Sequence, residues 1–168
     1  MTSDEISKAI DKANMQMAAG EYSKAYNVLK KLAKAYPDTA EAWFMMAEAS
    51  VGIPKLTIQE IASFYQKACD LAPDNPLYFA SYGNFCFENG ILKKGEECFL
   101  KAAELDDENS AVYLSDLATS YFFSARNFRN HYPNLSDDDI LKTSLRYILM
   151  AFNIDKEKAI TLLGSIET

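Results

Sequence analysis

The chain has 168 residues, 49% of them apolar, which fits one soluble domain with a sizeable core. Its formal net charge of −7 repels phosphate backbones, so nucleic-acid binding is not expected, because Lys and Arg supply most nonspecific affinity for nucleic acids. No stretch stays apolar for the roughly 18 residues that a membrane span needs, and Asp4, Glu5 and Lys8 interrupt any export signal, so we expect a cytoplasmic protein that does not enter a membrane.

The first predicted element is a pair of helices over about residues 6–39. Apolar residues recur at three- and four-residue steps through Met17, which is the spacing of an amphipathic helix. Gly20 supplies a turn, and a second helical pattern follows until Pro37 ends it, because the residue before a proline is pushed out of the helical region.

The same plan is repeated over about residues 40–75 and 76–110. The second hairpin has a longer turn, after which Thr57 and Glu60 have the spacing of a capping box for the next helix. The third hairpin turns at Gly90 and is the most regular. Matching second-helix positions recur after 36 and then 34 residues, a period typical of helical-hairpin solenoids.

The fourth hairpin, over about residues 111–156, departs from this period. Its first helical pattern runs from near Ser110 through Phe128, and a break at the following proline precedes a strong helix start at Ser136, where three aspartates match the helix dipole. The spacing between its two halves exceeds that of the third hairpin by about 14 residues. The final segment, residues 155–168, is predicted to be a capping helix.

The sequence contains few residues in arrangements that support catalysis. The three cysteines lie within helical patterns without a Cys-x-x-Cys pair, so we interpret them as buried apolar side chains. The one histidine, His131, has no predicted nucleophile beside it, and no glycine-rich phosphate loop is present. The sequence therefore predicts no enzyme, no metal site and no cofactor. A small-ligand or enzymatic use of the molecule is kept as a remote third alternative.

Two short patterns recur along the chain, one for each helix of a hairpin. In the first, a large residue is followed three and four positions later by an apolar and a small residue. In the second, a small or apolar residue is followed by a large apolar one, an apolar or small one, and then a proline. They are Trp43-x-x-Met46-Ala47, Phe79-x-x-Tyr82-Gly83, Leu114-x-x-Leu117-Ala118, Ala25…Leu29…Leu32…Pro37 and Ile61…Tyr65…Ala68…Pro73. The chain thereby resembles the tetratricopeptide repeat family over nearly its whole length.

This resemblance implies an all-α fold, a right-handed superhelical solenoid of about four helical hairpins plus a C-terminal capping helix. The whole chain, residues 1–168, would then be a single domain. Small residues such as Ala13 and Gly83 would let the paired helices approach closely, and Trp43 would belong to the core.

In this family the first helices of the hairpins line a concave groove that takes an extended peptide or a helix. By register, the resemblance places these residues in the groove: Asn14, Met17, Phe44, Glu48, Asn84, Phe87, Ser115, Thr119 and Phe122. The amides would donate to and accept from a peptide backbone, and the large apolar side chains would hold apolar anchors of the bound segment. The alternatives are that the amides are solvated helix residues and that the apolar side chains pack internally.

The resemblance also allows one subclass to be excluded. Adaptors of this family that grip a chaperone's C-terminal carboxylate use two Lys, two Asn and an Arg, whereas the matching positions here are Ile10, Asn14, Met45, Leu77 and Ser81. Without the cations, an acidic tail cannot be held. We therefore predict a protein-binding adaptor for a peptide or helix of a partner protein, and not a carboxylate-clamp chaperone adaptor.

Two hypotheses concern the longer fourth hairpin. Arg126, Arg129 and His131 would form a secondary docking patch for an acidic partner, or the arginines would pair internally with the aspartates at 137–139, which is the interpretation we favour. The alternative function is a structural or self-assembling protein, in which the fourth hairpin and the capping helix pack against a second copy to form a homodimer.

Overall fold

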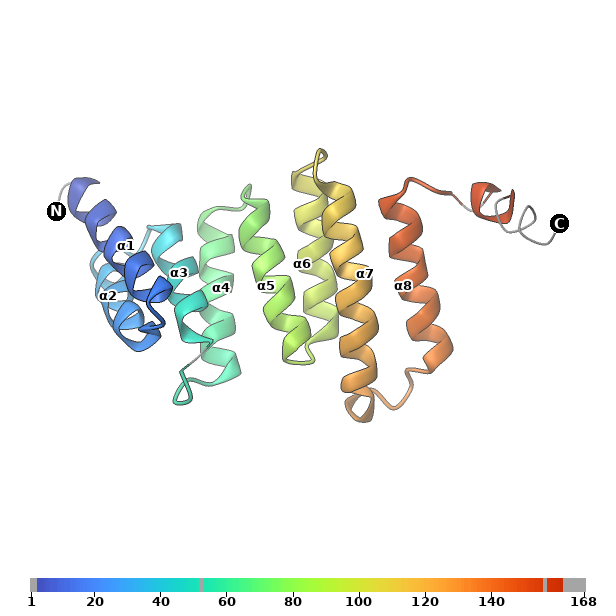
Figure 1. The fold of residues 1–168 in the computed structure, drawn as a ribbon, viewed down its shortest axis with the longest axis horizontal. Coiled ribbons are helices and arrows are strands. Elements are labelled where there is room, and N and C mark those ends of the chain that lie inside the picture. Colours follow the sequence, from blue (N-terminus) through green and yellow to red (C-terminus); the bar gives the residue numbers. More distant parts are fainter. Residues whose placement is uncertain (1–2, 52, 156, 162–168) are drawn as a thin grey trace. The chain divides into compact units, whose positions relative to one another are not determined.

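The computed structural model describes residues 3–51, 53–155 and 157–161, and within these ranges the regular structure is helical (Figure 1). The helices are α1 (Ser3–Ala18), α2 (Tyr22–Ala35), α3 (Ala40–Ser50), α4 (Ile58–Leu71), α5 (Pro76–Glu88), α6 (Leu92–Leu105), α7 (Ser110–Asn127), the 3-10 helix η1 (Arg129–His131) and α8 (Asp137–Ala151). The predicted all-α hairpin fold is confirmed. The chain divides into two compact units, Met1–Tyr78 and Phe79–Thr168.

In the first unit, α2 packs against α1 and α3, and α3 packs against α4. Ala13 and Ala25 are fully buried where α1 meets α2, as the small-residue pattern predicts. Trp43 is half-buried rather than fully enclosed, and its Nε1–H donates to the carbonyl of Pro37 over 2.8 Å. It therefore packs on the core and also fixes the turn between the first two hairpins.

The second unit has one core to which α5, α6, α7 and α8 all contribute. Gly83 on α5 and Gly95 on α6 allow the close approach of these helices. A Cβ added to Gly83 would lie 2.7 Å from the Phe99 ring, and one added to Gly95 would lie 2.8 Å from the Phe87 ring. These aromatic rings thus occupy the space that the two glycines leave open.

Positive backbone φ angles mark how the helices end. Gly20 after α1 and Gly90 after α5 both have φ +73, and their N–H groups and those of the next residues bond back to the helix in a Schellman motif. Asn153, with φ 53, ends α8 in the same way, through its own N–H to Met150 and that of Ile154 to Leu149. In contrast, the C-cap residues of α2, α4 and α6 have negative backbone φ angles, between −132 and −137, so these helices end without a left-handed residue at the cap.

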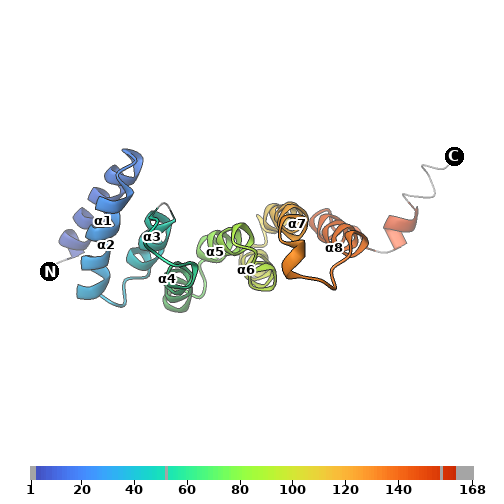
Figure 2. The ribbon, with the colours of Figure 1, turned by 90° about the horizontal axis from the view of Figure 1, so that it is seen from below.

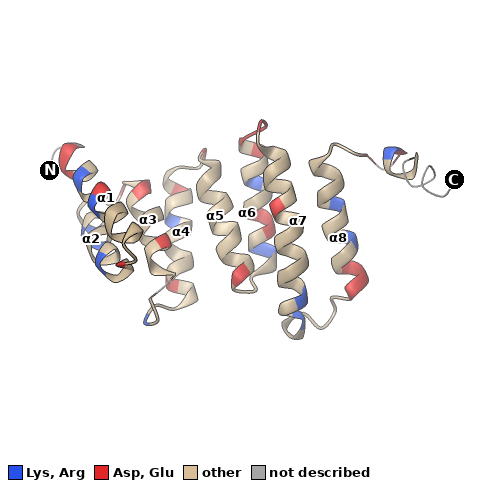
Figure 3. Cartoon of the chain, viewed as in Figure 1, with Lys and Arg blue, Asp and Glu red and all other residues tan. Residues whose placement is uncertain are grey.

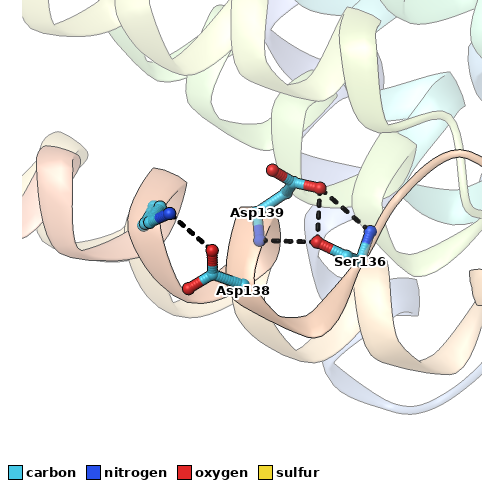
Figure 4. A network of polar contacts seen from close by, with 4 residues as sticks. Ser136, Asp138 and Asp139 are labelled. Carbon is cyan, nitrogen blue, oxygen red and sulfur yellow. Dashed lines mark hydrogen bonds and ion pairs between the residues drawn. The ribbon is translucent and has the colours of Figure 1, made fainter.

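Both predicted helix starts are confirmed as capping boxes. The Asp139 N–H donates to Ser136 Oγ over 3.1 Å, and the Ser136 N–H donates to the Asp139 carboxylate over 3.1 Å (Figure 4). Thr57 and Glu60 make the same reciprocal pair at the start of α4. The Ser136 side chain and backbone hold the pKa of Asp139 below its ordinary value.

The added length of the fourth hairpin is used for packing against the third. The Tyr132 hydroxyl donates to the carbonyl of Gly90 and accepts from the N–H of Leu92 over 3.4 Å. Phe128 covers the same turn closely, because a Cβ on Gly90 would lie 2.7 Å from its ring. Phe128 and Tyr132 of the fourth hairpin thus pack on the turn between α5 and α6 and bond to its backbone.

The chain continues past α8 into a short helical segment at residues 157–161. The predicted capping helix extends to residue 168, and residues 162–168 lie outside the described part, so the cap stays a prediction. Every helix in the described ranges is too short or too polar to cross a bilayer.

Candidate protein-binding surfaces

The helices α3, α5 and α7 carry far fewer charged residues than α2, α4 and α6 (Figure 3). The 42 residues of α3, α5 and α7 include five charged ones, four of them acidic, whereas the 42 residues of α2, α4 and α6 include thirteen. The four acidic side chains are those of Glu41, Glu48, Glu88 and Asp116. The first helices of these hairpins therefore offer surfaces of low charge and negative sign, which sequence motifs alone did not single out.

Two of the predicted groove residues in the first unit make contacts within the protein. The Phe44 ring stacks on Tyr78 with a centroid separation of 4.4 Å and meets Tyr65 edge-on. The Glu48 carboxylate accepts a hydrogen bond from the Tyr65 hydroxyl over 2.7 Å. Phe44 and Glu48 thus help to hold α3 against its neighbours.

The predicted amides remain accessible. Asn14 and Asn84 are both exposed on first helices, and Met17 is half-buried against the core of the first unit. Phe87, by contrast, is only 1% exposed and packs against the rings of Phe99 and Tyr121. The prediction that Phe87 lines a binding surface is therefore wrong, because α6 leaves room for its ring inside the core.

The remaining predicted residues lie on α7. Ser115 and Thr119 donate their hydroxyls to carbonyls one turn earlier on the same helix, over 2.8 Å and 2.9 Å. Phe122 is half-buried and meets Phe123 edge-on. Thr119 and Phe122 also line a cavity of about 280 Å³ between α7 and α8, which we call the α7–α8 hollow. Its lining consists of Ala118, Thr119, Phe122, Phe123, Leu141, Ser144, Leu145 and Ile148.

The predicted secondary patch is partly engaged within the fourth hairpin. The Arg129 guanidinium pairs with Asp137 across the turn, in agreement with the internal pairing that the sequence favoured. The Arg126 guanidinium lies over the Phe122 ring, 5.2 Å from its centroid. His131 is exposed and lines a second cavity, of about 390 Å³, together with Tyr132. A docking role for these three residues stays a prediction.

One polar cluster in the second unit was not predicted as a unit. Glu96 on α6 accepts a hydrogen bond from the Tyr147 hydroxyl of α8, and Arg146 lies 3.4 Å from the same carboxylate. Partial burial raises the pKa of Glu96, although Arg146 opposes the rise. The cluster joins α6 to α8.

The described residues were compared with the requirements of a metal site and of a reactive thiol. No cluster of three or more His, Cys, Asp or Glu side chains there could hold a metal ion. Cys69, Cys86 and Cys98 are buried, as predicted, and burial raises the pKa of the Cys98 thiol to about 11. At neutral pH, Cys98 is therefore a packed apolar side chain and not a nucleophile.

Comparison with known proteins identifies the repeat and the fold. Residues 9–49 match the family model of the tetratricopeptide repeat. No curated protein sequence matches the chain.

Solved structures agree with this match. MamA superposes with a TM-score of 0.69 at 16% identity, covering 92% of this chain and 75% of MamA. The type III secretion translocator chaperone SycD of Yersinia enterocolitica gives 0.64 at 16% identity, covering 71% of this chain and 86% of SycD. A putative kinesin light chain of Podosopora anserina with TPR-like repeats gives 0.59 at 10% identity, covering 97% of this chain and 93% of that one. Residues 9–49 thus match a tetratricopeptide repeat, and the chain shares its helical-hairpin fold with these solved structures.

Proposed function

We propose that the protein is a protein-binding adaptor that takes a peptide or helix of a partner on the exposed faces of its first helices. The observation that carries the proposal is the low, negative charge of α3, α5 and α7 beside the strongly charged second helices. A surface of this kind suits an apolar segment that carries basic residues. The similarity in fold to the translocator chaperone SycD supports a role in binding other proteins.

The exposed amides supply the proposed polar anchors. Asn14 in the first unit and Asn84 in the second can each donate to and accept from a bound backbone. Thr119 and Phe122 would add contacts in the second unit. We leave Phe87 out of the proposed surface, since it lies in the core.

Selection from a random peptide library tests this proposal. The full chain is expected to enrich peptides that combine apolar residues with Lys or Arg. A peptide that binds the first unit should bind Asn14→Ala about fivefold or more weakly, and one that binds the second unit should bind Asn84→Ala about fivefold or more weakly, the loss of one hydrogen bond of about 1 kcal/mol.

A matched control is available on a second helix. Asn27 is an exposed asparagine on α2, and Asn27→Ala should leave peptide affinity unchanged. Equal affinity in all three variants, or enrichment of acidic peptides, would contradict the proposed surface.

The fourth hairpin supports a second candidate, self-association. Phe123, Leu141 and Leu145 are each more than half exposed, although they are large and apolar. Clusters of this kind mark interaction surfaces.

Replacing Arg126 and Arg129 by Glu tests a separate question, whether these arginines dock an acidic partner or pair within the protein. Lost partner binding at unchanged melting temperature would favour docking. A lower melting temperature would favour internal pairing.

A further inference from the structure

A cavity of about 390 Å³ lies in the second unit where α6, α7 and the connection from α7 to α8 meet. Figure 2 shows this connection on the same side of the second unit as α6, and the Leu92 N–H of α6 donates there to the Tyr132 hydroxyl over 3.4 Å. We call the cavity the Glu96 pocket, and its volume lies within the range of about 300–1,000 Å³ that is usual for ligand sites. It is lined by Leu92, Lys93 and Glu96 of α6, by Tyr121 of α7 and by residues 131–135 of the connection.

The Glu96 carboxylate in this lining is incompletely paired. Its Oε1 atom accepts a hydrogen bond from the Tyr147 hydroxyl and lies 3.4 Å from the Arg146 guanidinium. Its Oε2 atom makes no hydrogen bond or ion pair with any residue that the structure describes. The side chain is only 28% exposed, and burying a carboxylate is costly unless donors replace the water that it loses. Glu96 therefore has room for one more donor.

The neighbouring charges do not neutralise this carboxylate. Partial burial raises the pKa of Glu96, Arg146 opposes the rise, and Glu97 adds to it. Arg146 is itself 60% exposed, a setting in which an ion pair contributes little. Lys93 is exposed and forms no ion pair with a residue in the described part of the chain. A further cation at Glu96 would thus meet a negative charge that is still largely unpaired.

Aromatic rings belong to the same lining. The Tyr132 ring is held in place because its hydroxyl is hydrogen-bonded to the backbone on both sides of the turn before α6. Tyr121 is 8% exposed and packs edge-on against Phe87. Aromatic rings attract a guanidinium group by cation–π contact and by stacking, and this group also offers several N–H donors in a planar fork. The Glu96 pocket combines a carboxylate with rings of this kind.

We propose that the Glu96 pocket binds an arginine side chain of a partner protein. The guanidinium donates to Glu96 Oε2 beside the tyrosine rings, and the apolar stem of the arginine contacts Leu92 and Leu135. A guanidinium suits this lining better than an ammonium, because it stacks on rings and donates in the same plane. The pocket is formed by α6 and the connection to α8 and not by the exposed faces of the first helices. The proposal therefore goes beyond the proposed function and does not depend on it.

Titration of the full chain with acetyl-arginine amide, followed by nuclear magnetic resonance, tests the proposal. The resonances of the Glu96 pocket, including those of residues 131–135, are expected to shift and to saturate. Acetyl-citrulline amide has nearly the same shape without the charge, so this matched probe should bind at least about fivefold more weakly, because the charge-assisted hydrogen bond is lost. Equal binding of the two probes, or no saturable shift with acetyl-arginine amide, would overturn the proposal.

Substitution of Glu96 completes the test. Glu96→Gln keeps an oxygen that can accept from Tyr147 but removes the negative charge, and it should weaken binding of acetyl-arginine amide at least about fivefold at unchanged circular dichroism. Glu97→Gln is the matched control, because Glu97 is exposed on the same helix outside the lining, and it should leave the affinity unchanged. An unchanged affinity in Glu96→Gln, or an equal loss in both variants, would overturn the proposal. The comparison of the two probes uses the wild-type chain, so it decides the question even where Glu96→Gln does not fold.

Discussion

Replacing Gly83 by alanine tests how closely α5 and α6 pack. The new Cβ would lie 2.7 Å from Cδ2 of Phe99 and 3.3 Å from the carbonyl oxygen of Gly95. The ring can shift only within a filled core, since Phe99 is fully buried, and the carbonyl belongs to the backbone of α6. The substitution therefore forces the two helices apart.

Two opposing effects set the expected magnitude. Alanine is more favourable than glycine inside a helix by about 1 kcal/mol. Adding a methyl group to a filled core costs typically about 1–3 kcal/mol. We expect a net destabilisation of about 1 kcal/mol, which for a chain of this size lowers the melting temperature by about 2–4 °C.

Urea unfolding followed by circular dichroism measures this effect, and a double-mutant cycle with Phe99→Leu assigns it. The smaller side chain should cost stability alone but cost less in the Gly83→Ala background, with a coupling of at least about 0.5 kcal/mol. If Gly83→Ala stabilised the protein by the helix-propensity gain, or if the two effects were additive, the close approach would not limit packing.

Three further predictions concern the Ser136 cap, the Glu96 carboxyl and the buried thiols. Ser136→Ala should cost about 1 kcal/mol at pH 7 by urea titration. Because hydrogen bonds from Ser136 lower the pKa of Asp139 from 3.8, this carboxylate favours folding above that pH, and the advantage over Ser136→Ala should disappear as the pH falls through the lowered pKa. Burial raises the pKa of Glu96 above 4.5, so wild type should gain stability relative to Glu96→Gln as the pH falls from 7 toward 4.5; an unchanged difference would contradict this. The cysteine thiols should react with iodoacetamide at pH 8 only in denaturant, since they are buried and Cys98 has a pKa of about 11; labelling in native buffer would refute this.

The elements of the fold could be predicted because their signals are local. The Thr57 and Ser136 capping boxes depend on residues three positions apart, and the turns at Gly20 and Gly90 depend on one residue that adopts positive φ. The repeat period then follows from packing identical helix pairs. None of these features requires knowledge of a distant partner.

The candidate surface was harder to predict because exposure depends on the next element in space. Helical spacing places Phe87 on a face, but only the gap left by Gly95 on α6 shows that this face is internal. Phe44 is half-buried, and one face of its ring stacks on Tyr78. Conversely, Leu141 and Leu145 fit the apolar spacing of a helix that packs on the core, yet both are more than half exposed.

The contacts of Tyr132 and Phe128 with the Gly90 turn affect how the second unit unfolds locally. In a repeat protein, each hairpin contacts only its neighbours through helix faces, so terminal hairpins can unfold separately. Here the fourth hairpin also holds the loop of the third, across 42 positions of sequence. Releasing α8 with its connecting segment would leave the Gly90 carbonyl without its donor and uncover the turn. The third and fourth hairpins should therefore open as one cooperative block, with similar protection of their backbone amides from hydrogen exchange.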